Sequence, residues 1–105
     1  MKYNLSDIES KEIVKGYKAK FVHSKNSTLA FWEVEKDAIL PTHSHIHEQT
    51  SQVLEGKFHL TIDGDTQIYE PGIIVIIPSN AVHEGKAITD CKLLDVFCPV
   101  REDYL

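Results

Sequence analysis

Short runs of alternating apolar and polar residues, separated by turn residues, limit the folds open to this chain more than any other feature. In residues 57–63, KFHLTID, the alternation has a period of two, as in a β-strand with one buried face. The dipeptides Asp63-Gly64 and Pro71-Gly72 are typical of turns between such strands. Similar runs recur and predict short strands at residues 18–24, 28–35, 38–45, 49–56, 57–63, 66–70, 72–78 and 91–99.

These strands predict an all-β fold, either a barrel or a double-sheet sandwich. We expect residues 1–105 to form a single domain, because this length suffices for one hydrophobic core but not for two. Residues 73–77, IIVII, are apolar at every position, so we expect this strand to be covered on both faces. Only residues 6–13 have a helical pattern, with Ser6 as N-cap and Glu9 three positions later. We also expect a homodimer, because a small barrel exposes strand edges and an apolar sheet face.

The composition argues against several classes of partner. A formal net charge of −5 argues against binding to nucleic acid. No apolar run approaches the roughly 20 residues of a membrane span, and the first residues lack the apolar core of a signal peptide, so we expect a cytoplasmic protein without a membrane partner. Cys91 and Cys98 lie on one predicted strand, about 23 Å apart, which is beyond disulfide reach. We therefore expect both thiols to be buried and reduced.

The histidines of the segment PTHSHIHEQ, residues 41–49, suggest a metal site. His43 and His45 are two positions apart on a predicted extended segment, so both imidazoles point the same way. Gln49 begins the next strand, and His83 follows an apolar strand and a turn. Imidazole nitrogen is a favoured ligand of borderline dications. We therefore predict one divalent metal ion, such as Zn, Ni, Mn or Fe, bound by His43, His45, Gln49 and His83.

Neighbouring residues leave alternatives to this ligand set. His47 has the same parity as the histidine pair before it, but the chain must turn before Gln49. His47 is therefore either a further ligand or a histidine at the rim of the site. Glu48 is an alternative to Gln49 as a ligand. His23 and His59 lie on other predicted strands, and we expect structural roles for both.

The predicted strand at residues 91–99 carries a second group of candidate residues. Lys92 tends to face water, which places Asp95 on the opposite, interior face together with Phe97. A carboxylate inside an apolar barrel is costly unless it is paired or functional, so Asp95 is a candidate general acid or base. Arg101, the only arginine, could bind a carboxylate through two hydrogen bonds. Alternatively, Asp95 forms a structural ion pair with Arg101 or a lysine.

The spacing of the candidate ligands resembles the two motifs of the cupin superfamily. The segments that carry this resemblance are His43-x-His45-x3-Gln49-x6-Gly56 and Gly72-x5-Pro78-x4-His83. The resemblance covers residues 27–101 and implies a double-stranded β-helix, or jelly roll, around one divalent metal ion. The sequence departs from the family pattern at four positions: Asp37 and Asn80 replace glycines, Gln49 replaces glutamate and Ala87 replaces asparagine. Asparagine tolerates the left-handed backbone conformation better than most residues.

The departure at Gln49 has a chemical consequence. Three neutral imidazoles and an amide leave the charge of a bound dication uncompensated, which favours an anionic substrate. The run Asp95-x-Phe97-x3-Arg101 is similar to that of small cupins of the KdgF type. These cupins linearise 4,5-unsaturated uronates released by pectate or alginate lyases. The resemblance implies that Asp95, Phe97 and Arg101 line the active site.

The resemblance therefore implies an isomerase that opens and ketonises an unsaturated uronate monosaccharide. In this interpretation Asp95 moves the proton, Arg101 orients the substrate carboxylate and Phe97 forms a wall of the pocket. Two alternatives remain open. The same scaffold hosts metal-dependent dioxygenases, which oxygen uptake would reveal. A non-catalytic module that binds a sugar or another small ligand would show binding without turnover.

Overall fold

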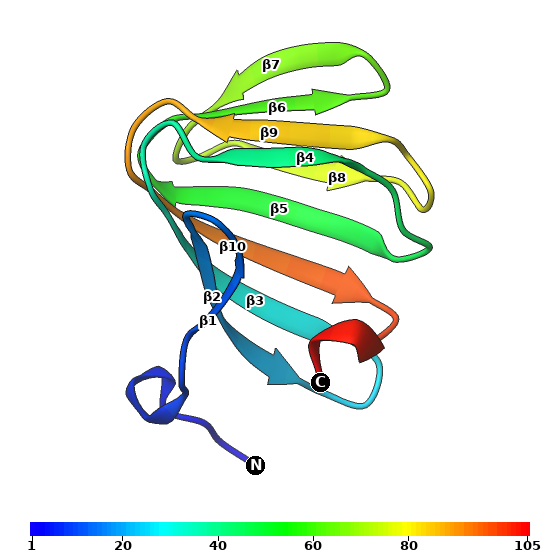
Figure 1. The fold of residues 1–105 in the computed structure, drawn as a ribbon. Helices are drawn as coiled ribbons and strands as arrows, with labels where there is room; N and C mark the ends of the chain where they lie inside the picture. Colours follow the sequence, from blue (N-terminus) through cyan, green and yellow to red (C-terminus); the bar gives the residue numbers. More distant parts are fainter.

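Ten β-strands form the body of the chain (Figure 1). The computed structural model describes residues 1–105. The strands are β1 (Lys11–Val14), β2 (Tyr17–His23), β3 (Thr28–Val34), β4 (Ile39–His43), β5 (Glu48–Glu55), β6 (Phe58–Ile62), β7 (Asp65–Tyr69), β8 (Ile74–Ile77), β9 (His83–Ala87) and β10 (Cys91–Cys98). The helical segments are two single 3-10 turns, η1 (Leu5–Asp7) and η2 (Glu102–Tyr104). Neither has the length and apolar character needed to cross a membrane.

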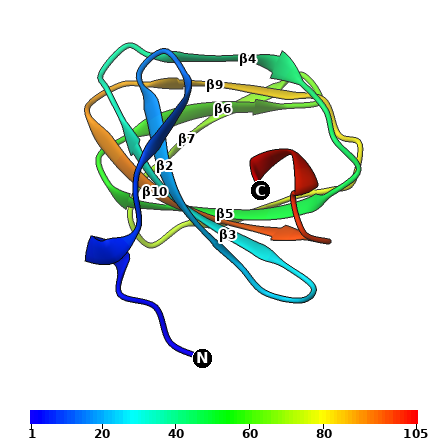
Figure 2. The ribbon, with the colours of Figure 1, turned by 60° about the horizontal axis from the view of Figure 1, so that its bottom comes forward.

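The strands form two antiparallel sheets that lie opposite each other. The larger sheet has the order β1-β2-β3-β10-β5-β8 and the smaller has the order β4-β9-β6-β7. In Figure 2 the two sheets surround the interior of the barrel, and the C-terminal turn η2 lies between them. The predicted all-β jelly roll is confirmed. In the larger sheet, β10 lies centrally and pairs with β3 on one side and β5 on the other.

The hydrophobic core comes from the inward positions of alternating strands. On β6, Phe58 and Leu60 are buried and Ile62 is half-buried, as the alternation predicts. The buried residues of β3 and β10 include Trp32 and Leu93, which pair across the two strands. The period of two therefore fixes which side chains of the larger sheet face the interior.

The helical prediction for residues 6–13 is wrong beyond one turn. The 3-10 turn covers only Leu5–Asp7, its N-cap is Asn4 rather than Ser6, and no side chain caps it. The following residues form strand β1, which pairs with β2. Such a short segment gains little from helix propensity alone, so pairing at the sheet edge decides its conformation.

Strand β9 has no counterpart among the predicted strands. Its sequence, HEGKA, places His83, Gly85 and Ala87 on the buried face and leaves Glu84 and Lys86 exposed. The buried residues are a histidine, a glycine and an alanine, so no apolar alternation marks this strand. Its position between β4 and β6 in the smaller sheet nevertheless makes it central to the site.

Two predictions of burial are wrong because they concern outward positions of the larger sheet. Ile74 and Ile76 are 64% and 61% exposed, since β8 is an edge strand and nothing in this chain covers its outer face. Cys98 is also exposed, whereas Cys91 is buried. Cys98 shares the outward face of β10 with Lys92, in line with the alternation of the strand. Both thiols are free, as predicted.

Two of the departures from the family pattern occur at left-handed backbone positions. Asp37 has φ of 70° and Asn80 has φ of 65°. Glycine adopts this conformation without strain, and aspartate and asparagine adopt it more readily than other residues. The substitutions therefore preserve the turns in which they lie.

Gly56 and Gly72 provide a test of how tightly the two motif turns are packed. Both have left-handed φ, 92° and 97°, but a Cβ on Gly56 would clash with the backbone oxygen of Asp90, whereas Gly72 faces open space. We expect Gly72→Ala to lower the free energy of unfolding by about 1–2 kcal/mol. We expect Gly56→Ala to lower it by about 3 kcal/mol or more. Urea denaturation of both variants checks this, and equal losses would contradict it.

Candidate metal centre

Three predicted ligands meet at one end of the barrel. His43 ends β4, His83 begins β9, and the two residues are partners in the register of these strands. His45 lies two residues beyond the end of β4, so the prediction that both members of the pair lie on one strand is wrong. A ligand nitrogen from each of the three histidines nevertheless lies within 4.8 Å of the others. The cluster could therefore hold one metal ion.

Backbone carbonyls fix the tautomer of all three imidazoles. Nδ1 of His43 donates to the carbonyl oxygen of Pro41 at 2.8 Å, and Nδ1 of His83 donates to that of Ala81 at 2.9 Å. Nδ1 of His45 donates to the carbonyl oxygen of the residue two positions on, at 3.0 Å. A carbonyl only accepts, so each Nδ1 carries the proton and each Nε2 presents a lone pair. This is the arrangement of metal-binding histidines.

The surroundings of two Nε2 atoms, those of His83 and His45, indicate that the site fits a cation. Nε2 of His83 is buried without a hydrogen-bond partner. Nε2 of His45 lies 3.1 Å from Oε1 of Gln49, so two lone pairs face each other. A cation between them would satisfy both atoms. Burial lowers the pKa of His83 and, together with Arg101, lowers that of His45 to about 4, so both imidazoles are neutral at pH 7, as metal binding requires.

The other candidate ligands lie outside the histidine cluster. His47 lies at the rim, where its Nε2 bonds to the backbone oxygen of Val100 at 3.2 Å. Glu48 is exposed on the opposite face of β5 from Gln49. His23 bonds to a threonine hydroxyl at the end of β2, and His59 is half-buried on β6. These positions agree with rim and structural roles.

Asp95 is the buried carboxyl next to the cluster. It lies on the interior face of β10, 5% exposed, as predicted from the outward direction of Lys92. Its Oδ2 accepts a hydrogen bond from Nε2 of Gln49 at 3.1 Å, while its Oδ1 has no partner. Burial raises the pKa of Asp95 to about 6, against the lowering effect of nearby polar groups such as Ser51. Asp95 therefore exchanges a proton close to neutral pH.

Asp95 forms no ion pair with Arg101 or with a lysine, so the structure does not contain the structural ion pair considered as an alternative. Nε and Nη2 of Arg101 instead donate to the two carboxylate oxygens of Asp103, at 3.0 and 2.7 Å. The guanidinium also lies over the rings of Phe97 and Tyr104, 4.7 and 4.1 Å from their centroids. Asp103 therefore uses two of the five N–H groups of the guanidinium.

The position of Gln49 explains why a carboxylate is disfavoured there. Its amide connects the histidine cluster to Asp95, with its oxygen toward His45 and its nitrogen toward the carboxyl. A glutamate would place a second carboxylate within hydrogen-bonding distance of Asp95, and two such groups do not both ionise readily.

We therefore expect Gln49→Glu to raise the pKa of Asp95 further above about 6, by about one unit or more. The carbon-13 chemical shift of the Asp95 carboxyl, followed by NMR during a pH titration, measures this. The matched control is Gln52→Glu, because Gln52 lies on the same strand but on the opposite face. An unchanged midpoint in Gln49→Glu would contradict the direct contact between the two side chains.

Residues that the sequence analysis did not select complete the cavity. Trp32, Ser51 and Tyr104 line it together with two of the histidines, Asp95, Phe97 and Arg101. Trp32 lies on the inward face of β3, which its alternation with Ala30 and Val34 does indicate. Nothing in the sequence indicates that η2 folds back over the barrel and brings Tyr104 into the cavity.

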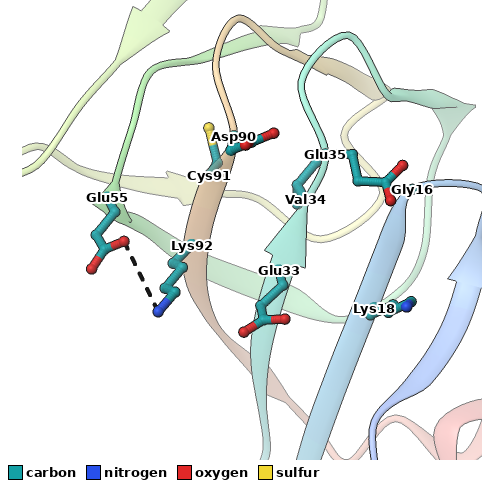
Figure 3. A pocket seen from close by; sticks show the side chains of 9 residues that line it. All are labelled: Gly16, Lys18, Glu33, Val34, Glu35, Glu55, Asp90, Cys91 and Lys92. Atoms are coloured by element: carbon teal, nitrogen blue, oxygen red, sulfur yellow. Dashed lines mark ion pairs between the residues drawn. The ribbon is translucent and has the colours of Figure 1, made fainter.

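A second hollow, of about 300 Å³, lies on the surface beside β2, β3 and β10 (Figure 3). Its lining mixes acidic and basic side chains, and the neighbouring Lys92 and Glu55 form a weak ion pair of 4.0 Å at one end of it (Figure 3). The histidine cluster lies elsewhere and is the one group of side chains with metal-binding spacing. The candidate site is therefore the interior cavity rather than this hollow.

Comparison with known proteins agrees with the geometry of the site. The family model described as "Cupin domain" matches residues 30–97. The chain belongs to the cupin family. Within this family it is 33% identical, over 72 residues, to the pectin degradation protein KdgF of Dickeya dadantii (strain 3937). The match covers 67% of this cupin and 66% of the relative, which is just under two thirds of the relative's length.

Solved structures show the same fold. KdgF from Halomonas sp. superposes with a TM-score of 0.89 at 23% identity, covering 95% of this cupin and 94% of that chain. An RmlC-like cupin from Shewanella frigidimarina NCIMB 400 superposes with a TM-score of 0.90 at 29% identity, covering 95% and 91% of the two chains. The jelly roll therefore extends well beyond the residues that the family model matches.

Proposed function

We propose that this cupin is a metal-dependent isomerase that opens and ketonises 4,5-unsaturated uronate monosaccharides from the breakdown of pectin or alginate. The observation that carries the proposal is Asp95, a buried carboxyl with one free oxygen, connected by Gln49 to the histidine cluster. The similarity to a pectin degradation protein supports the substrate class. Asp95, Phe97 and Arg101 line one cavity with two of the histidines.

The metal ion would be held by His43, His45 and His83, with Gln49 as a fourth ligand. When bound, it supplies Lewis acidity that stabilises negative charge on a substrate oxygen. The neutral amide of Gln49 does not cancel any of the ion's charge, which favours an anionic sugar over a neutral one.

Asp95 would move the proton. With a pKa of about 6 it is available in both protonation states near neutral pH. It would take the proton of the anomeric hydroxyl as the ring opens and return a proton to carbon as the enol becomes a ketone. The reaction is an isomerisation, so protons and electrons balance without another reactant.

Arg101 and Phe97 would position the substrate. The guanidinium is held by Asp103 and by two aromatic rings, and N–H groups that Asp103 does not use would bind a substrate carboxylate. The ring of Phe97 is 2% exposed and would form an apolar wall of the cavity. Because the protein as a whole is acidic, this local positive charge would have to attract the uronate.

An absorbance assay tests the proposal. Unsaturated monouronates generated by a pectate or alginate lyase lose their enol absorbance as they open. We expect metal-loaded protein to accelerate this loss and chelator-treated protein not to do so. If metal-loaded protein leaves the rate unchanged, the proposal is wrong. Oxygen uptake with a phenolic or diketone substrate would instead support a dioxygenase, and sugar binding without turnover would support a non-catalytic module.

We also propose that two copies pair through the outer face of the larger sheet. The exposed isoleucines of edge strand β8 are the basis for this, because apolar strand edges in water favour association. We expect Ile76→Lys to give a monomer by light scattering. The matched control is Ile39→Lys, because Ile39 is 62% exposed on the other sheet. A monomeric wild-type protein would contradict the proposal.

A further inference from the structure

Two buried polar atoms in the cavity lack hydrogen-bond partners, and a bound metal ion would not account for either of them. They are Nε1 of Trp32 and Oδ1 of Asp95. A third unpartnered atom in the cavity, Nε2 of His83, is explained as a metal ligand. Buried polar groups are rarely left unpaired, because doing so costs free energy. Neither remaining atom has a protein partner at good hydrogen-bond geometry, so a polar group of a ligand would find both free.

The two atoms lie close together on neighbouring strands. Trp32 is on β3 opposite Leu93, and Asp95 is on β10 opposite Ala30, so Trp32 and Asp95 are diagonal neighbours on the inward face. The residue directly opposite Asp95, Ala30, carries only a methyl group as its side chain. The indole is close enough to help lower the pKa of the carboxyl, although the two form no hydrogen bond of normal geometry. One is a donor and the other an acceptor.

We propose that Trp32 and Asp95 together bind one hydroxyl group of the sugar acid, which accepts from the indole N–H and donates to Oδ1. A hydroxyl is both donor and acceptor, so it satisfies the two atoms at once. A carboxylate would be repelled by ionised Asp95, and the ether oxygen of a glycoside has no proton to donate. If the proposed function holds, on which this step rests, the hydroxyl is the anomeric one. Trp32 and Asp95 then select free monosaccharides over glycosides.

The test compares a free sugar acid with its blocked form. Galacturonate has a free anomeric hydroxyl, and its methyl glycoside does not. We expect calorimetry to show that metal-loaded wild-type protein binds galacturonate about 10-fold more tightly than the methyl glycoside. Trp32→Phe keeps an aromatic ring and removes the N–H, so we expect it to lose that preference and to bind the methyl glycoside as the wild type does. Equal affinity of the wild type for both ligands would overturn the proposal, as would an equal loss for both in Trp32→Phe.

Tyr17→Phe is the matched control. The hydroxyl of Tyr17 already donates to the backbone oxygen of Ala38 at 3.2 Å, so its removal should leave the preference for galacturonate intact. Should Trp32→Phe fail to fold, the wild type still decides the matter, because Trp32 is the only tryptophan and its fluorescence reports on the cavity. We expect galacturonate to change this emission at concentrations about 10-fold lower than the methyl glycoside, and equal concentrations would overturn the proposal.

Turnover separates this inference from the proposed function. If the wild type prefers galacturonate but does not open unsaturated uronates, the proposed function fails and the hydroxyl site stands. If the wild type opens them and Trp32→Phe has the same kcat/KM, the hydroxyl site fails and the proposed function stands.

Discussion

Asp95→Asn is expected to slow the opening of unsaturated uronates by about 10²–10⁴-fold, the usual contribution of a general acid or base. Asparagine has nearly the same shape, and its oxygen can still accept the hydrogen bond that Gln49 donates to Asp95. What it loses is the proton exchanged by a carboxyl whose pKa lies at about 6. The initial rate of absorbance loss, measured with saturating metal and substrate, reports this change.

Two controls distinguish the loss of proton transfer in Asp95→Asn from a general structural effect: the metal content of the variant, and the activity of a variant at a second carboxyl. Asp95 does not belong to the cluster of three histidines that could hold the metal ion. Elemental analysis should therefore find the same metal content in Asp95→Asn as in the wild type. Asp65→Asn is the control, because Asp65 is exposed on β7 in the other sheet. Full activity in Asp95→Asn would show that the proton moves through another group.

Replacing His83 by alanine is expected to abolish the stabilisation that a divalent metal ion gives. An ion at about 100 times its dissociation constant stabilises the folded state by about 2.7 kcal/mol, which raises Tm by roughly 10–20 °C in a domain of this size. His83 is 1% exposed, and its Nε2 is unpartnered. Without it the cluster retains two imidazoles, and the shift should vanish.

The comparison uses the metal-induced shift rather than Tm itself. A buried histidine also packs, so His83→Ala will be less stable even without metal. His59→Ala is the control, since His59 lies half-buried on β6 outside the cluster. Zn, Ni, Mn and Fe should be tested separately with the chelator-treated protein. An equal shift in His83→Ala and the wild type would show that the ion binds elsewhere.

The sequence predicts most strands and the members of the site because both follow local rules. Alternation locates the inward faces of β6 and β10, and Lys92, from which the inward direction of Asp95 was predicted, is exposed. The histidine spacing identifies the cluster even though His45 is not on β4. These features depend on one strand or one motif at a time.

The features that the sequence does not predict depend on tertiary contacts. Strand β9 is formed by its neighbours rather than by an apolar pattern. The exposure of Ile76 reflects the position of β8 at the edge of the sheet, which no local pattern gives. The pairing of Arg101 with Asp103, rather than with Asp95, depends on how η2 turns back over the barrel.

The candidate ligands come from both sheets, which would give a bound ion a mechanical role. His43 and His83 belong to the smaller sheet, whereas Gln49 belongs to β5 of the larger one. An ion held by all three would cross-link the sheets at the mouth of the barrel. Local opening between the sheets would then become rarer. Amide hydrogen exchange should slow on β4, β5 and β9 when the ion binds, and should change little on the edge strands β1 and β7.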